Sequence, residues 1–179
     1  MAPAEPRQGG AATPGPATGT RRNSAAHRGG ERPLATMGYV DAMTSTIRAV
    51  GATGATLAAS AVAAGAFGAH TLRSHLDPRA LEIFATGAHY HLLHAVGVLV
   101  LAALAAASGG ATNRTRGLVR AAWLLVGGVV VFSGSLYVLA ISGVRGLGAV
   151  TPIGGVAMIA GWLTAAWSLL ISNSGEPEP

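Results

Sequence analysis

Residues 121–144 read AAWLLVGGVVVFSGSLYVLAISGV, an uninterrupted stretch of 24 residues between Arg120 and Arg145. This stretch contains no Asp, Glu, Lys or Arg. A helix of about 20 apolar residues crosses the hydrocarbon core of a bilayer, so the stretch predicts a membrane-spanning helix. Three further stretches that lack these four residue types predict the same: residues 49–69, 83–113 and 146–175.

The composition agrees with a membrane protein. Half of the 179 residues are hydrophobic (50%) and only 11% are charged, against roughly 25% charged residues in an average soluble domain. The mean hydropathy is +0.46. The chain has no Cys, which excludes disulfides, thiolate metal sites, iron–sulfur clusters and a Cys nucleophile. We therefore expect an integral membrane protein and not a soluble enzyme.

The predicted fold is all-α, a bundle of four transmembrane helices preceded by a disordered N-terminal tail. The membrane domain covers residues 47–172, with spans at about 49–69, 87–107, 121–144 and 152–172. Residues 1–46 are rich in Ala, Pro, Gly and Arg, a composition that buries too little apolar area to order a chain. Translation that starts at Met37 or Met43 would remove most of this tail. Residues 173–179 form a short acidic C-terminal tail.

The first span is the least apolar of the four, because ten of its 21 residues are Ala. Its small residues at positions 51, 55, 59 and 63 predict a face that another helix can approach closely. A cleaved signal peptide is the alternative, with Arg48 before the apolar run and small residues near Gly65 at the cleavage point.

The arginines flank the spans, and their distribution predicts the orientation. One side of the membrane carries Arg32, Arg48, Arg114, Arg116 and Arg120, and the other carries Arg73, Arg79 and Arg145. We therefore expect both termini in the cytoplasm, and the protein in the plasma membrane of a bacterium. The sequence pI of 11.1 follows from the same arginines. Since no basic stripe is interleaved with aromatic residues, we expect no nucleic-acid partner.

Five of the six His lie between residues 70 and 94, which raises the question of a metal site. On a regular helix His91 and His94 are about 60° apart and share a face, whereas His89 lies about 160° from His91. These three side chains therefore cannot bind one ion together. A metal site would need His91 and His94 with a ligand from elsewhere, such as His70 or Glu82, and we expect no metal and no cofactor. His94 lies within an apolar run, and an ionisable residue at membrane depth usually has a partner inside the bundle. We expect that partner to be Tyr137.

Two sequence pairs predict helix starts. Asp77-Pro78 and Thr151-Pro152 each place an N-capping residue before a proline, which suits the first position of a helix.

Four short segments resemble the DUF423, or UPF0382, family of small membrane proteins, which is related to the transmembrane protein 256 group. They are residues 65–70 (GAFGAH), 84–87 (FATG) with Tyr90 and His94, 132–137 (FSGSLY), and 151–155 (TPIGG) with Gly161 and Trp162. The resemblance covers roughly residues 47–172 and implies a four-span helical membrane protein with no established activity, substrate or cofactor. The chain has His91 where members commonly have Gln.

Threading the chain through four spans brings all four segments to one end of the bundle. We therefore hypothesise a polar ligand-binding pocket at that end, lined by His70, Tyr90, His94, Ser133, Ser135, Tyr137 and Thr151. No catalytic residues are predicted. The expected protein is non-enzymatic, with the lipid bilayer and either a second copy or another membrane protein as partners. A carrier or small-ligand or ion binder is one alternative, and a haem- or metal-binding redox protein is another.

Overall fold

The computed structural model describes residues 34–170, which are helical throughout apart from short connections. The long helices are α1 (Leu34–His70), α2 (Pro78–Ala107), α3 (Asn113–Ser142) and α4 (Thr151–Leu170). Two short 3-10 helices, η1 (Leu72–Ser74) and η2 (Arg145–Ala149), lie in the connections. No strand occurs in this part of the chain. Each of four helical segments is long and apolar enough to cross a membrane. The predicted all-α, four-span fold is confirmed.

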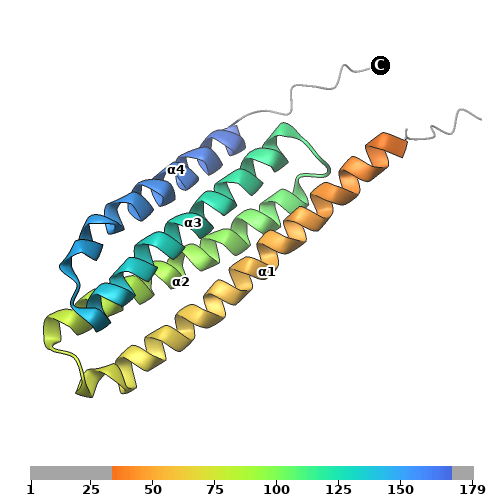
Figure 1. Cartoon of the computed structure of the whole chain (residues 1–179). Coiled ribbons are helices and arrows are strands. Elements are labelled where there is room, and N and C mark those ends of the chain that lie inside the picture. Colours follow the sequence, from red (N-terminus) through yellow and green to blue (C-terminus); the bar gives the residue numbers. More distant parts are fainter. Residues whose placement is uncertain (1–33, 171–179) are drawn as a thin grey trace, which may run out of the picture. The chain divides into compact units, whose positions relative to one another are not determined.

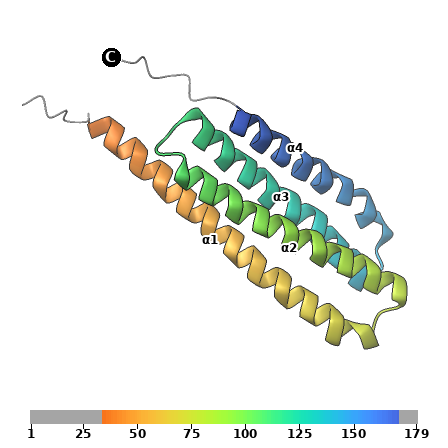
Figure 2. The ribbon, with the colours of Figure 1, turned by 180° about the vertical axis from the view of Figure 1, so that it is seen from behind.

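The helices pack as antiparallel neighbours in chain order (Figures 1 and 2). Helices α2 and α3 are central and contact each other along their length; α1 packs mainly on α2, and α4 mainly on α3. Both views show α1 and α4 on opposite outer sides of this central pair. The two outer helices therefore each depend chiefly on one neighbour.

The core lies between the helices and is mainly apolar. Val50 of α1, Val98 and Leu101 of α2, and Leu118 and Leu125 of α3 are at most 2% exposed. Large apolar side chains also cover the outside of α4, where Val156, Leu163, Trp167 and Leu170 are 65%, 66%, 68% and 78% exposed. A helix that is apolar on its outer face suits a lipid environment.

Helix α1 begins earlier than predicted, so residues 34–46 are helical where we expected disorder. The physical reason is that Met43 and Ile47 pack against the core cluster. The low apolar content that predicts disorder describes the residues before Met37, whereas residues 37–46 (MGYVDAMTST) supply apolar side chains at helical spacing. Residues 1–33 and 171–179, and with them the predicted acidic C-terminal tail, lie outside the described residues.

The contact face of α1 also differs from the predicted one. Ala55, Ala59 and Ala63 are not buried, whereas Val50 and Ala61, on the nearly opposite face of the helix, are. Since α1 has one principal neighbour, only one stripe of its surface is covered.

One of the two predicted caps is present. The Asp77 carboxylate accepts a hydrogen bond from the Ala80 backbone N–H at 2.8 Å, and Pro78 follows as the first residue of α2. Thr151, in contrast, is the first residue of α4 itself. Its hydroxyl lies 3.3 Å from the Leu147 carbonyl. The Val150 carbonyl accepts from the Ile153 N–H, so Thr151 is already inside the helix and does not cap it.

Candidate functional site

The four segments that carry the family resemblance lie at one end of the bundle. They occupy the end of α1, the first half of α2, the second half of α3 and the start of α4 (Figures 1 and 2). The connections 71–77 and 143–150 close this end, which we call the motif end.

A hydrogen-bonded bridge joins three helices here. The His91 ring of α2 lies between Tyr137 of α3, whose hydroxyl is 3.1 Å from Nδ1, and Ser60 of α1, whose hydroxyl is 3.4 Å from Nε2. The Ser60 hydroxyl donates its proton to the Leu57 carbonyl at 3.0 Å. With its one proton on the Leu57 carbonyl, Ser60 accepts from His91 Nε2–H, and in this tautomer Nδ1 accepts from the Tyr137 O–H. In this tautomer of the Ser60–His91–Tyr137 bridge, Tyr137 donates to His91 and His91 donates to Ser60.

Aromatic packing holds the bridge in place. The rings of Phe84 and Tyr137 are 4.6 Å apart, and Phe84 is 5% exposed. Gly87 allows this approach, because a Cβ at that position would lie 3.0 Å from Tyr137 Cε1. The residues of the FATG segment thus position the phenol that reaches His91.

The predicted pairing of His94 with Tyr137 is wrong. His94 Nδ1 donates to the Tyr90 carbonyl of its own helix at 2.8 Å, and its ring stacks on that of Tyr90 at 5.8 Å. The register explains the difference: Gly87 lies against Tyr137 and Gly97 lies against Leu125. His91 is one helical turn from Gly87, whereas His94 is about two turns from it along the bundle.

A second polar contact joins α3 to α4. The hydroxyls of Ser135 and Thr151 are 2.8 Å apart; Ser135 donates its one proton to the Phe132 carbonyl at 2.9 Å and accepts from Thr151. The neighbouring Ser133 is 1% exposed, and its hydroxyl has no hydrogen-bond partner in the part of the chain that the structure describes. Within residues 34–170, this hydroxyl is the one buried side-chain oxygen that the bundle leaves unpaired.

The seven residues of the predicted pocket thus form separate contacts. Tyr90 pairs with His94, and Ser135 pairs with Thr151, while Tyr137 pairs with a residue outside the set. His70 is exposed at the end of α1. A single pocket lined by all seven stays a prediction.

Sequence reasoning missed Ser60 and His91 as members of the site. His91 shares a helix face with His94, so its burial at 8% could have been expected from the same periodicity. Ser60 carries no signal of its own, because nothing in a polyalanine-like helix marks which hydroxyl will face a neighbour.

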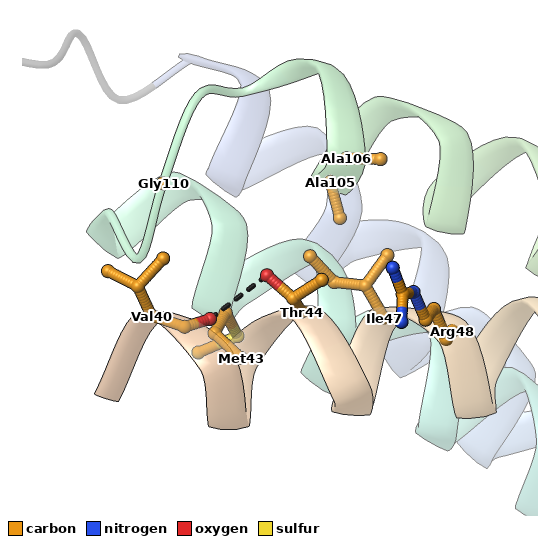
Figure 3. A pocket seen from close by; sticks show the side chains of 8 residues that line it. All are labelled: Val40, Met43, Thr44, Ile47, Arg48, Ala105, Ala106 and Gly110. Carbon is orange, nitrogen blue, oxygen red and sulfur yellow. Dashed lines mark hydrogen bonds between the residues drawn. The ribbon is translucent and has the colours of Figure 1, made fainter. Parts of the chain in front are cut away.

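Three of the hollows on the surface of the described helices lie between neighbouring helices. One of about 220 Å³ lies at the opposite end, where Val40, Met43 and Ile47 of α1 face Ala105 and Ala106 of α2, with Arg48 beside it (Figure 3). A second, of about 400 Å³, lies between α1 and α2 near Arg73. The third, of about 600 Å³, lies between the first turns of α2 and the end of α3.

The donor groups of the bundle are not arranged for metal binding. Among residues 34–170, no group of three or more His, Cys, Asp or Glu is placed to hold a metal ion. His91 uses both ring nitrogens within the bundle, and His89 is exposed on the other side of the helix.

The fold and these contacts define the class. Four antiparallel helices cross the membrane, polar side chains at membrane depth bond between helices, and apolar side chains cover the outside. The chain is a multi-pass integral membrane protein.

Comparison with known proteins identifies the family. Residues 64–155 match the model of a protein family of unknown function, DUF423. The chain belongs to this family. The match covers both central helices and the segments 65–70, 84–87, 132–137 and 151–155, whereas Gly161, Trp162 and the outer parts of the predicted range 47–172 lie outside it.

Curated bacterial relatives of this chain are membrane proteins as well. The UPF0382 membrane protein YwdK of Bacillus subtilis is 44% identical over 97 residues, which are 54% of this chain and 76% of YwdK. A UPF0382 membrane protein of Haemophilus influenzae is 37% identical over 108 residues, which are 60% of this chain and 82% of that protein. One of Staphylococcus haemolyticus is 40% identical over 97 residues, 54% of this chain and 75% of that protein. No solved structure matches the chain.

Proposed function

We propose that this chain is a non-enzymatic protein of the bacterial plasma membrane that acts through lateral contacts, with the lipid bilayer and with a second copy or another membrane protein. The proposal rests on the polar side chains at membrane depth, which form hydrogen bonds within the bundle. In the Ser60–His91–Tyr137 bridge and the Ser135–Thr151 contact, polar side chains at membrane depth form hydrogen bonds between neighbouring helices. Such hydrogen bonds stabilise helix association in membranes.

The bridge is poorly arranged for nucleophilic catalysis. A serine nucleophile hands its proton to the histidine beside it, and a third group orients that histidine. Here the Ser60 proton is held by the Leu57 carbonyl, and Ser60 accepts from His91. The group behind His91 is the phenol of Tyr137, which donates to the ring where a carboxylate would accept. This geometry supports a structural role for the Ser60–His91–Tyr137 bridge.

The lateral contact is tested with single cysteines, for which the natural absence of Cys makes the chain well suited. Val156→Cys lies on the outer face of α4 at 65% exposure, and Ala165→Cys, at 3%, is the buried control. We expect oxidation in native membranes to give a product of twice the monomer mass from Val156→Cys or the equivalent Leu163→Cys, and none from the control. Monomer alone from both outer positions, under expression at natural level, would contradict a self-contact through α4.

The proposed orientation places both termini in the cytoplasm and the motif end outside. It is supported by Arg48, Arg114, Arg116 and Arg120 at the end opposite the motif end, against Arg73, Arg79 and Arg145 at the motif end. A green fluorescent protein fused after residue 179 should fluoresce, and alkaline phosphatase inserted in the 143–150 connection should be active. The reverse pattern would refute the orientation.

A small-ligand binder or carrier is the second candidate, and one observation favours it. The Ser133 hydroxyl is buried without a partner in the described part of the chain, at the end of the bundle where the hypothesised pocket lies. A buried unpaired hydroxyl costs free energy unless something binds it. The stability of Ser133→Ala tests this candidate. The variant should lose stability if the hydroxyl binds something, and should gain stability if the hydroxyl is unpaired.

A further inference from the structure

The largest of the three hollows lies apart from the Ser60–His91–Tyr137 bridge. Its volume is about 600 Å³, and it opens between the first turns of α2, the last turn of α3 and η2. Arg79 of α2 and Arg145 of η2 both line it, although they are far apart in the sequence. Both side chains are exposed.

The charges around the hollow are unbalanced. Within residues 34–170, neither arginine side chain makes an ion pair or a hydrogen bond; the arginine hydrogen bond in this part of the chain is that of Arg116 to Asn113. Asp77 is the one acidic residue of the lining, and its carboxylate is engaged as the cap of Ala80 N–H. His75 directs Nδ1 to the Thr71 carbonyl at 2.8 Å. Two guanidinium groups thus line the hollow with their donors free.

The depth of the hollow places it at the surface of the bilayer. Helix α2 has 30 residues, which is about 45 Å of helix, against about 30 Å of hydrocarbon. Its first turns, with Arg79, therefore lie at the level of the lipid headgroups. On the same lining, Ile83, Leu139 and Ile141 supply an apolar surface next to the arginines. The arginines can contact the phosphate of a phospholipid while the apolar side chains contact its acyl chains.

We propose that this hollow binds an anionic phospholipid, with its phosphate between Arg79 and Arg145 and an acyl chain against Ile83 and Ile141. Arginine suits the phosphate because its planar guanidinium donates two parallel hydrogen bonds to such an anion. The second arginine gives the site its preference for a lipid with net negative charge, since a zwitterionic headgroup brings its own cation.

The test is native mass spectrometry of the full-length protein released from detergent in the presence of phosphatidylglycerol or phosphatidylcholine. The double variant Arg79→Gln, Arg145→Gln should lower the apparent affinity for phosphatidylglycerol about thirtyfold, with little change for phosphatidylcholine. Arg116→Gln, Arg120→Gln is the matched control, because it removes the same charge from the opposite end. Arg79→Lys, Arg145→Lys keeps the charge and should retain part of the affinity.

Three results would overturn the proposal. Equal losses in the two Gln pairs would mean that net charge alone attracts the lipid, and no loss in either would mean that the arginines do not hold it. If millimolar inorganic phosphate displaced phosphatidylglycerol completely, the site would be one for free phosphate. Circular dichroism of each variant, which changes only exposed side chains, confirms that the helices are intact.

Discussion

The contact between α3 and α4 and the contact between α1 and α2 join helices of the same bundle, but they are built differently. Between α3 and α4 the backbones meet: a Cβ at Gly154 would collide with the backbone of Phe132 and lie 2.8 Å from the Gly128 carbonyl. Between α1 and α2 the added Cβ of Gly54 would meet side-chain atoms of Val98 and Leu99, at 3.0 and 3.1 Å.

The amount of burial follows this difference. In its most apolar window α1 is 17% buried, against 44% for α2, 33% for α3 and 28% for α4. Membrane helices associate by van der Waals packing and hydrogen bonds, because lipid is as apolar as their own side chains. The glycines let the backbone of α4 pack more closely than that of α1, and each outer helix adds one side-chain hydrogen bond, Ser135–Thr151 for α4 and Ser60–His91 for α1. The two outer helices therefore differ in how closely their backbones approach the central pair.

The largest expected effect comes from placing a methyl group in the close contact between α3 and α4. Gly154→Ala should destabilise the protein by about 3 kcal/mol, because the new methyl group meets backbone that cannot move aside. The measurement is the free energy of unfolding in mixed micelles. Gly155→Ala is the matched control: its Cβ would lie 3.8 Å from Phe132 Cδ2, an ordinary contact, and the change should stay within about 0.5 kcal/mol. Equal effects of the two substitutions would contradict close backbone packing of α4.

Removing the hydrogen bonds of the bridge should have the next largest effect. His91→Leu should cost about 1–2 kcal/mol, since it leaves the Tyr137 hydroxyl without its partner, and His91→Gln should cost less because the amide both donates and accepts. In a double-mutant cycle, His91→Leu with Tyr137→Phe should show a coupling of about 0.6–1.7 kcal/mol. His94→Leu with Tyr137→Phe should show none, since His94 bonds to Tyr90.

The α1–α2 contact should tolerate a methyl group better. Gly54→Ala should cost about 1 kcal/mol or less, because the ends of Val98 and Leu99 can shift and alanine favours the helix. The same unfolding measurement compares it with Gly154→Ala. A cost at Gly54 as large as that at Gly154 would show that α1 is held as rigidly as α4.

The smallest expected effect is that of Ser133→Ala, and the sign of its change in unfolding free energy is informative. Ser133→Ala should raise stability by about 0.5 kcal/mol if its hydroxyl is simply unpaired, because the variant removes the cost of burying it. A loss of stability would instead indicate that the hydroxyl binds a water or a ligand. Ser135→Ala is the matched variant, and should be destabilising because it breaks the bond to Thr151.

The candidate site was only partly predictable. The order of the spans is enough to bring the segments 65–70, 84–87, 132–137 and 151–155 to one end of the bundle. Tyr137 could be predicted as a polar partner for a His of α2. Which His it meets could not, because His91 and His94 lie on one face and differ only in depth.

The class of protein and its four spans follow from the sequence alone. Crossing a bilayer depends on the length and apolarity of each segment, which are local properties of the chain. Asp77-Pro78 likewise specifies the start of α2, because a cap acts on the backbone three residues away.

Tertiary packing selects the contacts that join the helices. It makes α1 pack with Val50 and Ala61 and not with its Ala55 and Ala59 face. It also makes His91 the bridge between three helices, and brings Arg79 and Arg145 to one hollow. These contacts depend on the rotation and register of each helix against its neighbours, which are set jointly by side chains far apart in the chain.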